Sequence, residues 1–244
     1  MKVDVRRLTV RYGAVTAVHD LSLGVPSGQR RAVIGPNGAG KTTLFNAITG
    51  DIRPAAGSIA LDGHDVSRLG PWRRARLGLA RTFQRSTLFP GLPVAENLAL
   101  AIRLRARRSW VFWPGGERRL RQEVAERLAA ARLDRVASRA AASLSHGEQR
   151  VLEIELALAA RPRLLLLDEP MAGLSGAERQ AALEQLRSLP PDVTLVVVEH
   201  DLDAVFAIAQ WISVLDRGML LADGTPEQVR ADSRVQEVYL GSRG

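Results

Sequence analysis

The chain has 244 residues, and 46% of them are apolar, which is ordinary for a globular protein and argues against a disordered one. It contains no cysteine, so disulfides and cysteine-based zinc or iron–sulfur sites are excluded. The net charge of +8 fits either an anionic partner or an Arg-rich composition spread over solvated surfaces, and we favour the second.

The sequence also bears on where the protein acts. It has no run of about 18 uncharged apolar residues, and its first residues, Met1–Arg7, lack the apolar core of a signal peptide. We therefore expect a cytoplasmic protein, held at a membrane only if a partner holds it there.

The pattern of apolar residues predicts strands and helices in alternation. Strands are predicted over residues 2–10, 21–25, 31–34, 57–61, 79–83, 164–167 and 193–198, with a hairpin over 212–222. Helices are predicted over residues 42–49 and 71–77, through the segment 93–160 with a break at 113–116, from Asp201 onward, and over 226–239.

Strands and helices thus alternate at both ends of the chain, with a helical insertion between them. This predicts an α/β fold with a parallel sheet core, a separate N-terminal antiparallel β layer and an inserted helical subdomain. Within a single domain spanning 1–244, we place the core at 1–85 and 161–244 and the helical subdomain at 86–160.

One motif predicts that the chain binds the phosphates of a nucleotide. Residues 35–43 read G-P-N-G-A-G-K-T-T, which is the phosphate-binding loop, and Lys41 is one of only two lysines in the chain. A compact ammonium fits inside a tight loop where a planar guanidinium would not. Thr42 is expected to place its hydroxyl on Mg²⁺. The predicted phosphate contacts are Gly35, Pro36, Asn37, Gly38, Ala39, Gly40, Lys41, Thr42 and Thr43.

A second motif supplies the acidic residues that phosphate chemistry needs. Leu164–Leu167 is a continuous apolar run, as in a strand buried on both faces, and Asp168 and Glu169 follow it directly. Acidic side chains at the carboxyl end of such a strand lie where α/β sheets bind ligands. We expect Asp168 to hold Mg²⁺ and Glu169 to orient or deprotonate the attacking water.

A third motif, Leu144–Gln149, reads L-S-H-G-E-Q, about 20 residues before that strand. Here the chain resembles the ATP-binding subunits of ABC transporters, whose signature is Leu-Ser-Gly-Gly-Gln. The resemblance implies a P-loop NTPase (RecA-like) core that binds and hydrolyses ATP with Mg²⁺. It also implies that the signature contacts the γ-phosphate held by a second subunit, so that two chains enclose two ATP molecules. The residues concerned are Ser145, His146, Gly147 and Glu148. His146 and Glu148 depart from the family pattern, and we interpret them as marks of a subtype.

The same resemblance assigns three further residues. Tyr12 matches the aromatic residue that stacks on adenine, Gln84 the Q-loop glutamine that contacts Mg²⁺ and the attacking water, and His200 the switch histidine near the γ-phosphate. Segment 172–175 matches the D-loop, with Ser175 where many members have Asp. The aromatic patch Trp110–Trp113 either packs within the helical subdomain or contacts a membrane subunit or lipid.

Finer features resemble the ATPases of branched-chain amino acid importers. They are Arg81–Gln84, Val94–Leu98, Val198–Asp201, Ala222–Pro226 and Val238–Gly241. The resemblance implies a homodimer or heterodimer with a second ABC ATPase, membrane permease subunits and, indirectly, a solute-binding protein. The chain would then lie at the inner face of the membrane.

Other readings of these motifs stay open. They are the ATPase of a urea or amide importer, that of a lipopolysaccharide-type exporter, and a non-transport ABC ATPase acting on nucleic acid or ribosomes. A nucleic-acid partner is not expected, because the chain has no room for the coiled coils or tandem cassettes of such proteins. A P-loop kinase or GTPase would leave the signature and His200 unexplained.

Overall fold

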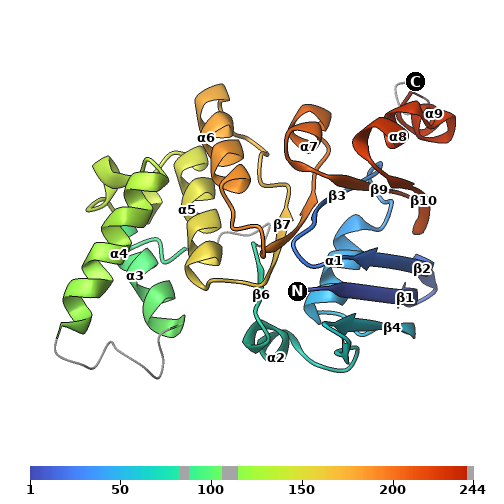
Figure 1. The fold of residues 1–244 in the computed structure, drawn as a ribbon, viewed down its shortest axis with the longest axis horizontal. Coiled ribbons are helices and arrows are strands. Elements are labelled where there is room, and N and C mark those ends of the chain that lie inside the picture. The colour runs from blue at the N-terminus through green and yellow to red at the C-terminus, as the bar shows by residue number, and fades with distance from the viewer. Residues whose placement is uncertain (83–87, 106–114, 241–244) are drawn as a thin grey trace. The chain divides into compact units, whose positions relative to one another are not determined.

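The computed structural model describes residues 1–82, 88–105 and 115–240, and Figure 1 gives the order of the elements. Its contacts divide the chain into two compact units. The core unit comprises Met1–Arg81, Arg163–Glu169 and Pro190–Gly244, and the helical unit comprises Thr82–Pro162 and Pro170–Leu189. The subdomain boundaries expected from the sequence stay a prediction.

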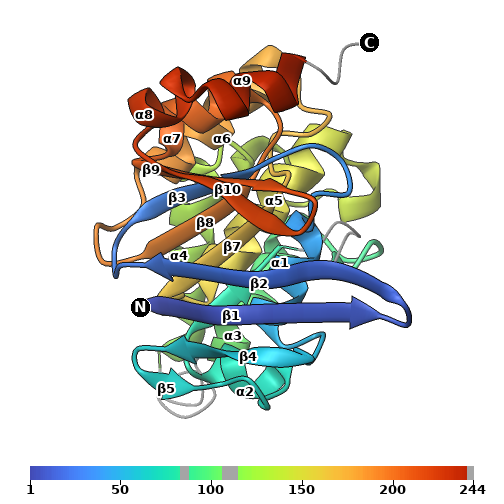
Figure 2. The ribbon, with the colours of Figure 1, turned by 90° about the vertical axis from the view of Figure 1, so that its right-hand side faces the viewer.

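The N-terminal strands form a four-stranded antiparallel sheet in the core unit. In order across the sheet they are β2 (Val15–Val25), β1 (Val3–Tyr12), β4 (Ala56–Leu61) and β5 (His64–Asp65), as Figure 2 shows. The side chains of Val3, Val5, Leu8 and Val10 are buried, so the apolar positions of β1 face the core. The predicted antiparallel layer is confirmed, and β5 is an addition to it.

The second sheet of the core unit carries the predicted parallel strands. Its order is β10 (Met219–Gly224), β9 (Trp211–Asp216), β3 (Arg30–Ile34), β8 (Thr194–Val198), β7 (Leu164–Asp168) and β6 (Leu79–Arg81). All pairings are parallel except that of β10 with β9, which is the predicted hairpin. Every residue of β7 and β8 is buried, which explains why both strands are apolar except for Asp168 at the end of β7 and Thr194 at the start of β8.

Helix α1 (Lys41–Thr49) contributes to the core that both sheets share. Its buried residues Leu44, Phe45 and Ile48 belong to one apolar cluster with residues of the antiparallel sheet, such as Val10, and of the parallel sheet, such as Leu166. The core unit also contains α2 (Pro71–Arg76), α7 (Leu202–Ile208), α8 (Pro226–Ala231) and α9 (Ser233–Leu240).

The helical unit contains four α-helices among its described residues. They are α3 (Val94–Arg105), α4 (Gly116–Ala130), α5 (His146–Ala159) and α6 (Gly176–Arg187), with single 3₁₀ turns at Asp134–Val136 and Ala141–Ser143. Leu98, Ile102, Leu120 and Leu152 lie in its core cluster. The helical character of 93–160 is confirmed, whereas α6 was not among the predicted helices.

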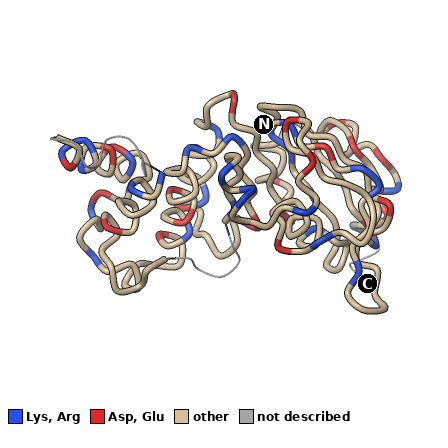
Figure 3. The backbone as a smooth tube through the Cα atoms, turned by 90° about the horizontal axis from the view of Figure 1, so that it is seen from below, with Lys and Arg blue, Asp and Glu red and all other residues tan. Residues whose placement is uncertain are grey.

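Charge is spread along the whole chain. Figure 3 shows Lys and Arg interleaved with Asp and Glu in both units. Among the described residues, no helix is long and apolar enough to cross a bilayer. The aromatic patch at 110–113 lies outside the described residues.

A buried arginine caps the C-terminal end of α1. Arg74 of α2 is 0% exposed and donates to four main-chain carbonyls, those of Ala47 (2.6 Å), Ile48 (2.7 Å), Leu69 (2.9 Å) and Ser67 (3.5 Å). The last carbonyls of a helix lack intrahelical partners, so the guanidinium supplies donors to the end of α1, where Ala47 also accepts the N–H of Gly50 at 3.3 Å. Burial lowers the pKa of Arg74 to about 10, and the side chain therefore stays charged at neutral pH.

Replacing Arg74 by Met should lower the free energy of unfolding by about 3 kcal/mol, because the stem still packs while the buried carbonyls lose their donors. Urea denaturation monitored by fluorescence measures the change. Arg73→Met on the exposed side of the same helix is the control and should stay within about 0.5 kcal/mol of the parent. An equal loss in both variants would contradict the role given to Arg74.

Candidate nucleotide site

The loop that joins β3 to α1 follows a path that only glycine permits at two points. Gly35 has a φ of 149°, and Gly40, which precedes α1, has a φ of 97°. A Cβ at Gly35 would overlap the carbonyl oxygen of Leu215, and a Cβ at Gly40 would lie 2.6 Å from that of Ala17. The loop is therefore held between the strand β2 and the end of β9, with its backbone free to approach a ligand.

The side chain of Lys41 lies inside this loop. It is 8% exposed, and its Nζ donates to the carbonyl oxygens of Gly35 (2.7 Å) and Pro36 (2.9 Å). Burial lowers the pKa of Lys41, while the nearby carboxylates of Glu169 and Asp168 act in the opposite direction. The ammonium thus sits at the centre of the loop, held by neutral acceptors that a phosphate oxygen could replace.

At the carboxyl end of β7, Asp168 is buried completely and faces a second buried cation. Arg81, the last residue of β6, donates from Nη2 to Asp168 Oδ2 at 3.2 Å. Its Nη1 donates to Asn46 Oδ1 (2.6 Å) and Asp51 Oδ2 (3.1 Å) at the C-terminal end of α1. One guanidinium therefore links the end of α1 to the carboxylate at the end of β7.

Glu169 occupies a backbone conformation that is rare for its residue type. Its φ is 49°, in the left-handed region, and its N–H donates to the carbonyl of Val198 at 2.9 Å. Such conformations persist where surrounding structure imposes them, often at functional sites. The side chain leaves the strand and lies partly exposed, with Oε1 3.8 Å from Nδ1 of His200. The structure thus places these two predicted site residues side by side, while their roles stay a prediction.

The remaining loop and sheet residues lie where a ligand could reach them. Thr42 is exposed on the first turn of α1 and Thr43 is half-buried; Tyr12, at the end of β1, is 48% exposed. Gln84 lies outside the described residues.

In the helical unit, the signature segment forms the N-terminus of α5. Ser145 is the N-cap, and its Oγ accepts the N–H of Glu148 at 3.1 Å. In return, Oε2 of Glu148 accepts the N–H of Ser145 at 2.8 Å, which completes a capping box. The carboxylate of Glu148 thus stabilises the first turn of α5. His146 and Gly147 form the first turn.

The donor set of the core unit suits Mg²⁺ bound together with a phosphate. Among the described residues, no group of three or more His, Cys, Asp and Glu side chains could hold a metal alone. Mg²⁺ is usually held by one or two protein oxygens, with water and substrate phosphates completing its shell. The hydroxyl of Thr42 and the carboxylate of Asp168 are oxygen donors of that kind.

Comparison with known proteins gives the family. The family model described as ABC transporter matches residues 18–172 of this chain. The chain belongs to the ABC transporter family. A second model, described as branched-chain amino acid ATP-binding cassette transporter, matches residues 219–244 of this ABC ATPase.

Curated relatives align over nearly the whole chain. The high-affinity branched-chain amino acid transport ATP-binding protein BraF of Pseudomonas aeruginosa is 39% identical, with 98% of this chain and 97% of that protein covered. LivG of Escherichia coli K12, named as a protein of the same kind, is 37% identical over 98% of this chain and 97% of its own length. ATP hydrolysis is the general activity of the family, and this chain is an ABC ATPase.

Solved structures show the same fold. A nucleotide-free ATP-binding cassette of an ABC transporter has a TM-score of 0.84 and is 26% identical, covering 98% of this chain and 99% of its own. The ADP conformation of such a cassette has a TM-score of 0.83 at 25% identity, covering 99% of both chains. These similarities confirm the predicted α/β fold and support the binding of a nucleotide.

Arg81 is the residue of this site to which sequence reasoning gave no role. It was noted only as part of the Arg81–Gln84 family pattern. The sequence signal for this role is an arginine at the end of a short strand. A charged side chain at such a position needs an ion-pair partner, and acidic residues end two other elements, at Asp51 after α1 and at Asp168 in β7. Only the sheet order β8-β7-β6 shows that the partner is Asp168.

Replacing Arg81 by Met should lower the free energy of unfolding by about 3 kcal/mol, because Asp168 loses a buried cationic partner. Arg81→Lys should recover only part of the loss, since an ammonium lacks the planar fork with which the guanidinium contacts both Asp51 and Asp168. Urea denaturation measures both. The control is Arg163→Met, which removes a more exposed ion pair with Asp62 and should cost at most about 1 kcal/mol. Equal losses at the two positions would refute the linking role.

Proposed function

We propose that this protein is the ATP-binding and hydrolysing subunit of an importer for branched-chain amino acids. The observation that carries the proposal is the alignment, over nearly its whole length, with proteins named as branched-chain amino acid transport ATP-binding proteins. The family match at residues 219–244 supports the same branch. The urea, amide and lipopolysaccharide alternatives have no such support.

Phosphate binding would begin at the loop of residues 35–43. Its N–H groups and the N-terminus of α1 attract the phosphate oxygens, and Lys41 exchanges the carbonyls of Gly35 and Pro36 for the β- and γ-phosphates. The buried ammonium then stabilises the charge that develops during transfer. Tyr12 would stack on the adenine.

Bound Mg²⁺ would neutralise part of the charge on the transferring phosphoryl group. Thr42 and Asp168 would hold it, with Gln84 as a further contact. Arg81 holds Oδ2 of Asp168 through the contact at 3.2 Å, so the carboxylate is preorganised for Mg²⁺ and nucleotide.

Glu169 would act on the attacking water. It follows Asp168 directly, and its left-handed backbone turns the side chain away from the strand. The carboxylate accepts a proton from the water as this attacks the γ-phosphorus in line with the leaving oxygen. His200, 3.8 Å away, and Gln84 would orient the water and the γ-phosphate.

The complete site would need two chains. The signature residues Ser145, His146, Gly147 and Glu148 would contact the γ-phosphate bound by a second ABC ATPase, either an identical copy or a related subunit. A related cassette, 26% identical, has been solved as a dimer with ADP and phosphate. Closing and opening of the dimer would drive permease subunits, placing the protein at the inner face of the membrane, and a solute-binding protein would act through them.

Glu169→Gln should retain ATP binding and lower turnover by at least a hundredfold, because the amide cannot accept the proton of the water. With ATP it should also accumulate as a dimer. Phosphate release and sedimentation velocity measure the two effects. Glu237→Gln on α9 is the control, as an exposed carboxylate in the same unit. Normal turnover in Glu169→Gln would remove Glu169 from the mechanism.

The same variant tests the solute. In a strain lacking this gene, the wild-type protein should restore uptake of labelled leucine and Glu169→Gln should not. Restored uptake of urea with no effect on leucine would contradict the assigned solute. Salt-sensitive stimulation of ATPase activity by DNA or RNA would favour the non-transport alternative instead.

Lys41→Arg should lose MgATP affinity by at least tenfold and fail to dimerise with ATP, since a guanidinium cannot occupy the space between Gly35 and Pro36. Isothermal titration measures the affinity. The chain offers a matched control in Lys2→Arg, the same substitution at the only other lysine, which is exposed and pairs with Asp4 at 3.0 Å. Unchanged affinity in Lys41→Arg would show that the steric argument is wrong.

A further inference from the structure

The carboxylate of Glu178, on the first turn of α6, lies against the N-terminus of α5. Its Oε1 accepts the hydroxyl of Ser145 at 3.0 Å. Its Oε2 accepts the hydroxyl of Ser175 at 2.7 Å and the N–H of Ser175 at 2.9 Å. All these residues belong to the helical unit, so the contact is internal to one compact body.

Gly147 makes this position available to the carboxylate. A Cβ on Gly147 would overlap the carboxyl carbon and both oxygens of Glu178. The carboxylate therefore rests directly on the first turn of α5, in space that any other residue at 147 would fill. The two groups in contact are a carboxylate and a helix N-terminus. They attract each other because the N-terminus carries the positive end of the helix dipole.

The first turn of α5 is a place where an anion is stabilised. The N–H groups there have no intrahelical acceptor, and the helix dipole adds positive potential. Ser145 contributes a hydroxyl donor. Hydrogen bonds from Ser175, and to a lesser degree from Ser145, lower the pKa of Glu178, so the group is an anion at neutral pH.

We propose that Glu178 is an internal ligand of the signature helix and occupies the position that the terminal phosphate of a nucleotide, held by a second copy of the chain, takes in the dimer. This inference rests on the proposed function. Phosphate binding then requires the carboxylate to give up Ser145 and move away from Gly147. Glu178 therefore opposes closure of the dimer in the absence of nucleotide. It also sets the ATP concentration at which the dimer closes.

The competing explanation is that Glu178 only stabilises α6, because it forms a capping box with Ser175. That role does not need Ser145 or Gly147. It also does not need a charge, since Gln228 serves as the same element of the capping box at the start of α8, where Thr225 is the N-cap. Glu178→Gln therefore preserves the cap and removes the anion, so a capping role alone predicts no change in the dimer, whereas an internal ligand predicts a tighter dimer.

The test uses the full chain with Glu169→Gln as the parent, so that ATP binds without turnover. Sedimentation velocity at a series of protein concentrations with saturating MgATP gives the dimer dissociation constant. Adding Glu178→Gln should tighten the dimer by at least tenfold, since each dimer contains two such contacts. Glu178→Ala should also tighten it, whereas a capping role alone predicts an unchanged dimer for Gln and a weaker one for Ala.

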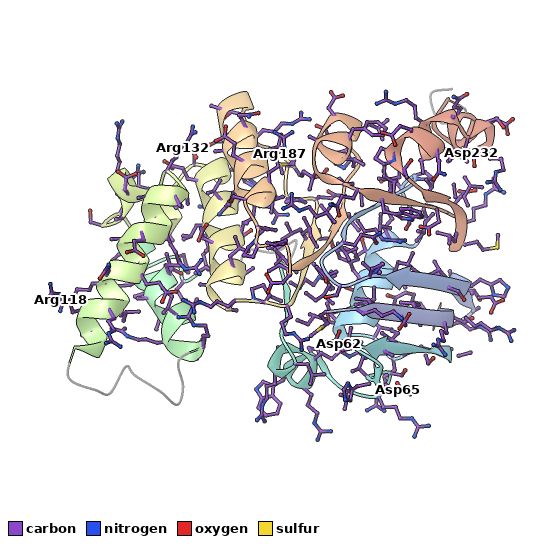
Figure 4. All side chains as sticks on the ribbon, in the orientation of Figure 1. Asp62, Asp65, Arg118, Arg132, Arg187 and Asp232 are labelled. Carbon is purple, nitrogen blue, oxygen red and sulfur yellow. The ribbon has the colours of Figure 1, made fainter. Side chains whose placement is uncertain are left out.

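Glu184→Gln is the matched control, because it makes the same change of charge on the same helix. Glu184 pairs with Arg132, labelled in Figure 4, at 3.0 Å. Its dimer should stay within twofold of the parent. Unchanged or weaker dimers of a folded Glu178→Gln variant would overturn this inference alone. A parent that stays monomeric with MgATP would overturn the proposed two-chain site and this inference with it.

Discussion

The phosphate loop keeps its shape because main-chain atoms of two other segments pack closely against two of its glycines. The carbonyl of Leu215, at the end of β9, lies at Gly35, and that of Ala17, in β2, lies at Gly40. The loop therefore depends on both sheets of the core unit, and it is not a free turn between β3 and α1. A hydrogen bond from Gly218 N–H to the carbonyl of Ala39 at 3.1 Å joins the β9–β10 turn to the same loop. The antiparallel layer thus helps to build the nucleotide site, besides carrying Tyr12.

Around this loop, buried charges are placed so that each meets a partner. Lys41 is held by main-chain oxygens, Asp168 by Arg81, and the guanidinium of Arg81 also by Asn46 and Asp51. Buried charges are costly unless they are paired and hydrogen-bonded, so these arrangements fix positions as well as energies. Before any ligand binds, the groups expected to meet phosphate and Mg²⁺ are already held close to one another.

The sequence was sufficient for the parts of this fold that depend on local pattern. The strands β1, β3, β7 and β8 follow from alternation or from unbroken apolar runs, and the phosphate loop follows from fixed spacing. Helix α6 was not predicted because its apolar face is narrow: its buried residues are only Ala182, Leu183 and Leu186, which give a weak periodic signal. The sequence nevertheless contains a signal for the start of α6, because Ser175 and Glu178 have capping-box spacing. The contacts of Arg81 and of Glu178 with Ser145 join distant segments, and no local pattern encodes them.

Helix α1 also has a consequence for how the site attracts its ligand. Its C-terminal carbonyls carry the negative end of the helix dipole, and Arg74 already neutralises them from within the protein. Its first turn, by contrast, contains no acidic residue. The C-terminal carbonyls thus face a cation, while the first turn of α1, which begins with Lys41, carries no acidic residue of its own and has the carboxylates of Glu169 and Asp168 near its ammonium. A phosphate bound at this end would meet the N-terminal N–H groups and the Lys41 ammonium with no acidic residue of the same turn to repel it.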